Sequence, residues 1–182
     1  MGALPLAKYL RALSQNLLKP HQTLAYTKYF TARVKSPQEK MQRQAIYLDA
    51  LQTLDDFSIT YGKYQLTPQT CRRCGHSYQA ASEKMTDVNI AVELLQDAFQ
   101  DVFDTAILIS ADSDLVGPVQ AIKRLPKKRI VIACPPNRFS QHLCGTAHSH
   151  IQIGRGVIAK SLFTEEVRTS SGFVIRRPAS WG

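Results

Sequence analysis

The sequence predicts a single α/β domain in which helices cover both faces of a mostly parallel sheet. One observation is its length, because 182 residues with 44% hydrophobic side chains are enough for one substantial core. The other is alternation: segments with strand character alternate with segments of helical spacing, which implies right-handed crossovers between parallel strands. Ligands in such folds bind beyond the carboxyl ends of the strands. We therefore expect the functional residues there.

The first half of the chain contains two predicted helices and two predicted strands. Four leucines with helical spacing mark the apolar face of the first helix: Leu6, Leu10, Leu13 and Leu17. The segment 23–34, rich in Thr, Tyr, Phe and Val, predicts a strand. A Ser-Pro dipeptide then provides a cap and a first-turn proline for a helix over 36–54. Apolar and polar residues alternate over 57–66, which predicts a second strand followed by a loop at 67–82.

The second half continues the alternation. Its predicted elements are a helix over 88–99, a strand over 104–110, a strand over 129–134, a short helix over 139–147 and a last strand near 151–153. The strand at 104–110 is nearly all apolar, which is typical of a strand buried on both faces. A tail at 164–182 completes the predicted single domain over 1–182.

Charge and composition restrict the classes of function. Lys and Arg number 23 and Asp and Glu 14, and the net charge of +9 attracts polyanions such as nucleic acid. No apolar run approaches the ~20 residues of a membrane-spanning helix, and the first residues lack the pattern of a secretory signal. The four cysteines are too few for a disulfide scaffold. We therefore expect a cytoplasmic protein without a membrane segment.

Carboxylates and hydroxyls follow the apolar strand at 104–110. Asp112 and Asp114 lie two residues apart, so an extended backbone directs both side chains to one side, where they can share a divalent cation. Asp87, at the start of a predicted helix, can project over the same edge of the sheet. For each aspartate taken alone, capping of free helix N–H groups is the competing explanation.

Two segments that contain these aspartates resemble the NYN domain family. They are Lys-Met-Thr-Asp-Val-Asn at 84–89 and Ser-Ala-Asp-Ser-Asp-Leu at 110–115. The resemblance extends from about Leu6 to Trp181, and the order and separation of the two motifs match the family. The NYN domain belongs to the PIN-like class, whose members are metal-dependent ribonucleases with a three-layer α/β/α sandwich. The resemblance therefore implies this fold and this activity.

The resemblance also implies roles for particular residues. Asp87, Asp112 and Asp114 are expected to bind Mg²⁺ or Mn²⁺, hard cations that prefer carboxylate oxygens. The supporting polar groups expected at the site are Ser110, Ser113 and Asn89. The implied reaction is hydrolysis of a phosphodiester bond of RNA, expected to be single-stranded, by a metal-activated water.

One family feature has no counterpart in this sequence. The family's first element is a central strand with a further aspartate, in a pattern resembling Asp-Gly-x-Asn, and nothing before Ala25 corresponds to it. Three explanations stay open: the chain starts at an internal methionine of a longer protein, which we favour; another segment fills the gap; or the protein binds without cutting. Unpaired strand edges predict aggregation unless the chain dimerises or exchanges a strand.

Cysteines and arginines outside the two motifs supply further candidates. Cys71 and Cys74 have the spacing of a zinc half-site, but a structural zinc site needs four ligands. Further ligands would have to come from Cys134, His142, Cys144 and His148, which lack a recognised ligand spacing. Zinc is therefore the less favoured interpretation. In the alternative interpretation of this loop, Arg72 and Arg73 contact RNA phosphates. Arg138, after a strand on the presumed active edge, is another RNA contact, and Ser113 a further one.

Two other classes of function compete with a ribonuclease. The first is a nucleic-acid-binding or regulatory module that keeps the fold but does not cut. The second is a phosphatase or nucleotide-binding protein, because acidic sites at strand ends also hold metals for phosphomonoesters. The net charge of +9 favours a polymeric anion over a small one.

Overall fold

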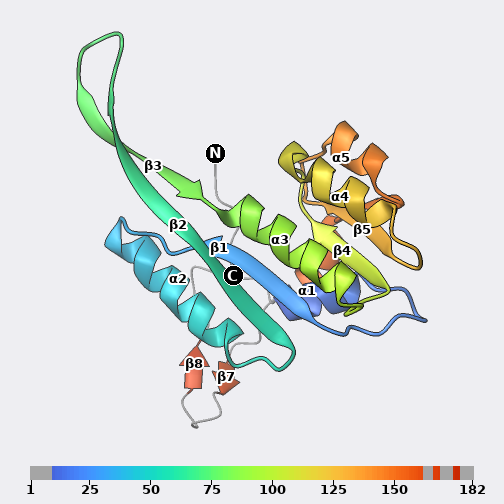
Figure 1. Ribbon diagram of the computed structural model, residues 1–182. Helices are drawn as coiled ribbons and strands as arrows, with labels where there is room; N and C mark the ends of the chain where they lie inside the picture. Colours follow the sequence, from blue (N-terminus) through green and yellow to red (C-terminus); the bar gives the residue numbers. More distant parts are fainter. Residues whose placement is uncertain (1–9, 162–165, 169–173, 177–182) are drawn as a thin grey trace.

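The computed structural model describes residues 10–161, 166–168 and 174–176 (Figure 1). The elements of this part of the chain are, in order, α1 (Leu10–Asn16), β1 (Thr27–Ala32), α2 (Gln38–Leu51), β2 (Phe57–Thr70), β3 (Ser77–Lys84), α3 (Thr86–Phe99), β4 (Thr105–Ile109), the 3-10 helix η1 (Ser113–Leu115), α4 (Val116–Lys123), β5 (Arg129–Cys134), α5 (Gln141–Thr146), β6 (Ser149–Gln152), α6 (Arg155–Lys160), β7 (Glu166–Arg168) and β8 (Val174–Arg176). None of the described helices is long and apolar enough to cross a membrane.

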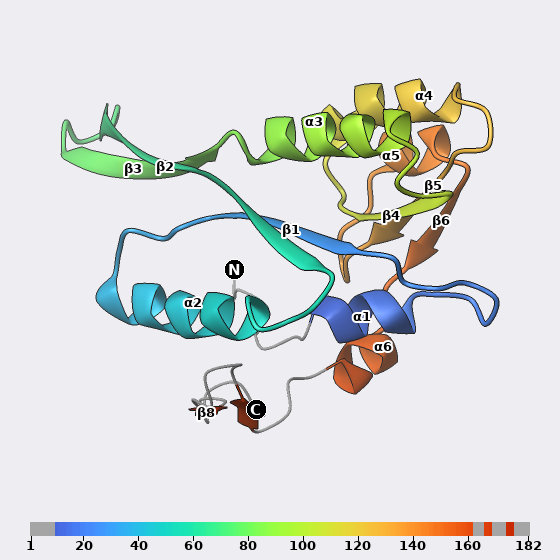
Figure 2. The same ribbon diagram turned by 60° about the horizontal axis from the view of Figure 1, so that its bottom comes forward.

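The elements form three layers, which confirms the predicted fold class. In Figure 2 the strands β1 to β6 form the middle layer, with α3, α4 and α5 on one face and α1, α2 and α6 on the other. The parallel pairs β1–β2, β4–β5 and β5–β6 are joined by helical crossovers, as expected for an α/β domain.

Strands β1 to β6 form two separate three-stranded sheets, β1-β2-β3 and β4-β5-β6. Within the described residues, β1 and β4 each hydrogen-bond to one strand only, so each has an unpaired edge. This agrees with the expected absence of a central strand. Helices connect the two sheets: α3 packs on β1 and β2 and also contributes Ala98 to the core over β4 and β5, and Leu10 of α1 contacts the cores of both sheets.

The main core lies between the second sheet and the helices α3, α4 and α5. Its strand β5 is deeply buried, and Ile130, Ile132 and Cys134 have no exposed surface. The neighbouring β4 was expected to be buried on both faces, but its residues are only partly buried and Ile109 is 38% exposed. The physical reason is that β4 is an edge strand among the described residues, whereas β5 has a strand on each side.

The segment 67–82 is not the predicted loop. Residues 67–70 continue β2, and 77–84 form β3, which pairs with β2 in antiparallel register from Lys63 opposite Lys84 to Thr70 opposite Ser77. The polar sequence of β3 carries little apolar alternation, and backbone pairing with β2 holds it as a strand. The resulting hairpin projects beyond the helices in both views (Figures 1 and 2).

Smaller differences between the structure and the predictions concern the ends of elements and the C-terminal region. The N-cap position of α2 is Pro37, and no side chain caps the helix, so the predicted cap by the preceding serine is wrong. Leu6 lies outside the described residues, and α1 begins at Leu10. The region after β6 contains α6, β7 and β8, which the sequence did not predict; β7 and β8 pair as a small antiparallel sheet.

Candidate active site

The turn after β4 fixes the position of Asp112. Its backbone N–H donates to Ser110 Oγ at 3.0 Å, and its own Oδ1 accepts the N–H of Asp114 at 3.0 Å. Asp112 is therefore the N-cap of η1, as the capping explanation required. This cap engages one carboxylate oxygen and holds the side chain in place, which leaves the second oxygen for another ligand.

A close approach of β2 places Asp87 in the first turn of α3. A Cβ added to Gly62 would lie 2.5 Å from Thr86 Oγ1 and 2.7 Å from the backbone oxygen of Lys84, so only glycine fits here without a shift. Asn89 Nδ2 donates to the carbonyl of Tyr61 at 3.3 Å and joins α3 to the same strand. Asn89 thus positions the helix that carries Asp87.

The three predicted aspartates interact through their charges. Partial burial raises the pKa of Asp87, and the negative charges of Asp112 and Asp114 raise it further. These aspartates come from two elements, α3 and the turn leading into η1, which contact each other. The structure therefore brings the three carboxylates into one neighbourhood, and their role as metal ligands stays a prediction.

A fourth carboxylate belongs to this cluster and was not predicted. Glu83, at the end of β3, also raises the pKa of Asp87, and its Oε1 accepts the hydroxyl of Thr86 at 2.5 Å. The only sequence signal was its position four residues before Asp87. That signal is weak, because the strand that brings Glu83 to the site was itself not predicted.

The donor chemistry of the cluster fits a hard divalent cation, because every side chain in it offers carboxylate oxygens. The described residues contain no group of three such side chains close enough to hold a metal ion directly. Mg²⁺ usually keeps several waters and takes one or two protein carboxylates. The exposed side chains of Asp112 and Asp114, with Asp87 nearby, meet that requirement.

The predicted RNA contacts lie in two different places. Ile109 of β4 pairs with Ala133 of β5 in parallel register, so the turn with Arg138 follows β5 at the same edge as Asp112. Arg138 is exposed there. The pair Arg72 and Arg73, by contrast, lies at the tip of the hairpin, eight strand residues or about 25 Å from the start of α3. These two arginines cannot touch a phosphate bound at the aspartates.

A match to a family model identifies the family of this chain. The family model of the NYN domain matches residues 4–154. The chain belongs to the NYN domain family. The match ends before α6, so the resemblance expected to continue to Trp181 stops earlier. The family is one of nuclease-type folds, which at a coarse level places the chain among the hydrolases.

The solved structures give a likeness of fold. The NYN domain is similar to a protein of unknown function from Vibrio parahaemolyticus RIMD 2210633, known from a crystal structure. The two share 18% sequence identity with a TM-score of 0.51, over 86% of this chain and 82% of the other. At this identity the likeness shows the fold alone. No curated protein matches the chain.

The two cysteine pairs of the NYN domain lie in different parts of the structure. Cys134 and Cys144 are buried in the main core with their sulfur atoms 2.9 Å apart, whereas Cys71 and Cys74 lie at the hairpin tip. His148 belongs to the core region, where its Nδ1 accepts the N–H of Ile130. The described residues contain no group of three potential ligands. Within the described part of the chain, the two cysteine pairs therefore lie in different parts of the fold.

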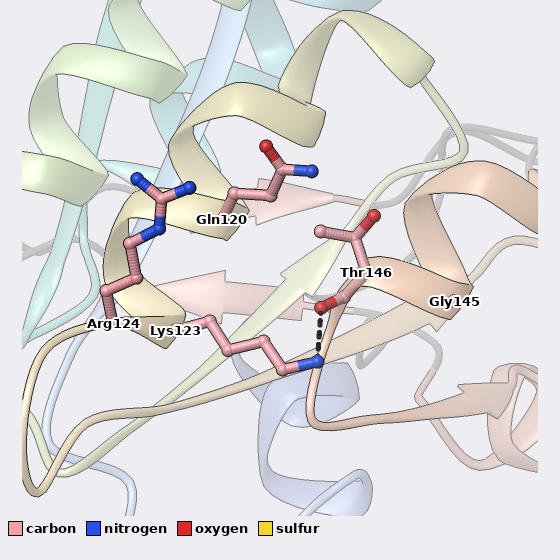
Figure 3. A pocket seen from close by; sticks show the side chains of 5 residues that line it. All are labelled: Gln120, Lys123, Arg124, Gly145 and Thr146. Atoms are coloured by element: carbon pink, nitrogen blue, oxygen red, sulfur yellow. Dashed lines mark hydrogen bonds between the residues drawn. The ribbon is translucent and has the colours of Figure 1, made fainter.

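A pocket of about 360 Å³ lies between α4 and α5 and is not part of the aspartate cluster (Figure 3). Its lining residues are Gln120, Lys123, Arg124, Gly145 and Thr146. The amine of Lys123 donates to the carbonyl of Thr146 at 2.9 Å and to that of Ala147 at 3.3 Å. The pocket lies at the end of α4 opposite to Asp114, and no carboxylate lines it.

Asp87→Asn is expected to stabilise the folded NYN domain slightly. The folded pKa of Asp87 is raised above 3.8, so its charge costs stability above that raised pKa, and the cost disappears as the pH falls below 3.8. At this exposed position we expect about 0.5 kcal/mol, or an increase in melting temperature of about 1–2 °C at pH 7. Thermal unfolding of both proteins from pH 7 to pH 3.5 measures the difference. Equal melting temperatures at pH 7 would contradict the proposed repulsion.

Proposed function

We propose that this NYN domain is a metal-dependent ribonuclease that hydrolyses phosphodiester bonds of single-stranded RNA. The observation that carries the proposal is the cluster of Asp87, Asp112 and Asp114: α3, which carries Asp87, contacts η1, and the charges of Asp112 and Asp114 add to partial burial in raising the pKa of Asp87. The protein as a whole is strongly basic, with a net charge of +9, so the acidic cluster is surrounded by a field that attracts polyanions.

The three aspartates would hold Mg²⁺ or Mn²⁺. The bound cation supplies activation of a water and neutralises charge on the phosphate during in-line displacement. The protein's part is geometric: the Ser110 contact holds the backbone of Asp112, the Asp114 contact holds its side chain in one orientation, and the Asn89 contact fixes α3 on β2. No covalent protein nucleophile is needed.

Arg138 and Ser113 are the proposed contacts to the substrate phosphate. Both residues are exposed at the edge that carries Asp112. The hairpin arginines, Arg72 and Arg73, would bind RNA several nucleotides away from the cut. Such contacts contribute affinity without sequence information and weaken as salt rises.

A second function is favoured by a specific observation. The described residues contain no three potential ligands at metal-binding distance. A cluster without three ligands at metal-binding distance supports an RNA-binding or regulatory module that does not cut. The two functions share the interface and differ only in hydrolysis.

Labelled single-stranded RNA incubated with the full chain and Mn²⁺ or Mg²⁺ tests both proposals, with fluorescence anisotropy as the binding readout. Metal-dependent fragments that disappear with EDTA would support the ribonuclease. Binding without fragments would support the regulatory module and contradict the nuclease. A folded chain that neither binds nor cuts RNA, but hydrolyses a phosphomonoester such as p-nitrophenyl phosphate, would overturn both in favour of a phosphatase.

A further inference from the structure

The tip of the β2–β3 hairpin is an ordered turn built around two cysteines. The backbone N–H of Cys71 donates to the carbonyl of His76 at 2.8 Å, and the N–H of Gly75 donates to the carbonyl of Cys71 at 2.9 Å. Gly75 has a φ of +70°, a conformation that glycine adopts without strain. These contacts hold Cys71 and Cys74 on one compact turn between the strands.

The spacing of the two cysteines on this turn is that of a zinc half-site. Cys71 and Cys74 are separated by two residues, and pairs with this spacing bind one metal ion through their thiolates. A hairpin tip does not need two cysteines in order to turn. The arrangement therefore points to a metal ion that binds thiolates, such as Zn²⁺.

One tip supplies only half of a structural zinc site. Such sites are tetrahedral and use four Cys or His ligands, whereas the described part of the chain contains no group of three potential ligands. The other pair, Cys134 and Cys144, is buried in the main core and cannot reach the tip. The missing ligands must come from a second molecule.

We propose that the hairpin tips of two copies of this chain bind one Zn²⁺ between them, through Cys71 and Cys74 of each copy. The two half-sites are identical, so a two-fold axis through the metal completes a set of four thiolates. This inference does not rest on the ribonuclease proposal, because none of the aspartates takes part in it.

Charge and shape favour a second copy as the partner. Zn²⁺ with four thiolates has a net charge of −2, and Arg72 and Arg73 of both tips place positive charge beside it. The hairpin projects beyond the helices, so two tips can meet without collision of the domains (Figures 1 and 2). Leu66 and Tyr78, which are 46% and 47% exposed on the arm, provide apolar surface for contact between the arms.

The test measures the mass of the full chain by analytical ultracentrifugation while Zn²⁺ is titrated, with a phosphine reductant present to prevent disulfides. We expect one Zn²⁺ per two chains, release of thiol protons on binding, and a dimer that EDTA dissociates. The double variant Cys71→Ser/Cys74→Ser should stay monomeric, with at least ~100-fold weaker zinc affinity. Cys144→Ala removes a thiol from the core instead and should dimerise like the unchanged protein.

Cobalt provides a second readout that does not depend on mass. Co²⁺ in place of zinc should show the visible absorption typical of a tetrahedral tetrathiolate site, and Cys71→Ser/Cys74→Ser should lack it. One metal per chain without a change in mass would overturn the shared site, as would no metal binding. A dimer that persists in EDTA and in the double variant would show that another surface joins the chains, and would also overturn the proposal.

Discussion

Asp112→Asn is expected to reduce cleavage of single-stranded RNA by at least ~100-fold, because a bound metal ion contributes several kcal/mol to catalysis and each 1.36 kcal/mol is a factor of ten. The substitution removes the charge that the cation needs. It keeps an oxygen that can accept the N–H of Asp114, the contact by which Asp112 caps η1. The fold should therefore persist while the activity is lost.

The comparison with Asp112→Ala separates the two roles of this residue. The alanine variant loses both the charge and the cap, so it should lose the same activity and also about 1 kcal/mol of unfolding free energy. Asp49→Asn, at an exposed position of α2 away from the cluster, is the matched control and should cut normally. Initial cleavage rates and urea unfolding curves give both quantities. Full activity of Asp112→Asn would sink the proposed metal site.

Gly62→Ala is expected to lower the unfolding free energy by about 1–3 kcal/mol, the usual cost of overpacking a close contact. The added Cβ would lie 2.7 Å from the backbone oxygen of Lys84, which cannot move without moving the junction between β3 and α3. That junction positions Asp87. RNA cleavage should therefore decrease together with stability, although Gly62 itself touches no substrate.

Gly117→Ala is the control for this prediction. A Cβ at Gly117, within α4, meets no atom within 4 Å, and alanine favours a helix over glycine. The control should therefore gain about 0.5–1 kcal/mol of stability. Urea denaturation monitored by circular dichroism measures both variants. A gain of stability in both variants would show that the close approach of β2 to α3 does not constrain the fold.

Local patterns in the sequence determined much of the architecture. The apolar run at Arg129–Cys134 was predicted with the bounds that the structure shows, because a continuous apolar segment between a basic turn and two prolines has few alternatives. The helix with Asp87 and the strand before Asp112 were likewise predicted. The family followed from the same residues.

The description of the site required both the sequence motifs and the tertiary structure. The family motifs predicted that Asp87 lies near Asp112 and Asp114, and in the structure the pKa of Asp87 responds to both charges. Glu83 was missed because it lies on β3. That strand is stabilised by its pairing with β2, and pairing between distant residues leaves no periodic signal in a polar segment.

By itself, the sequence determined the fold class, the family and the positions of the strongly apolar elements, because each depends on residues close together in the chain. Only the tertiary structure decided that Cys71 and Cys74 lie at the tip of a projecting hairpin, apart from Cys134 and Cys144, and that β4 is an edge strand. These facts depend on which strands pair and on which surfaces remain open. Both are settled by contacts across the chain, for which local propensity carries no information.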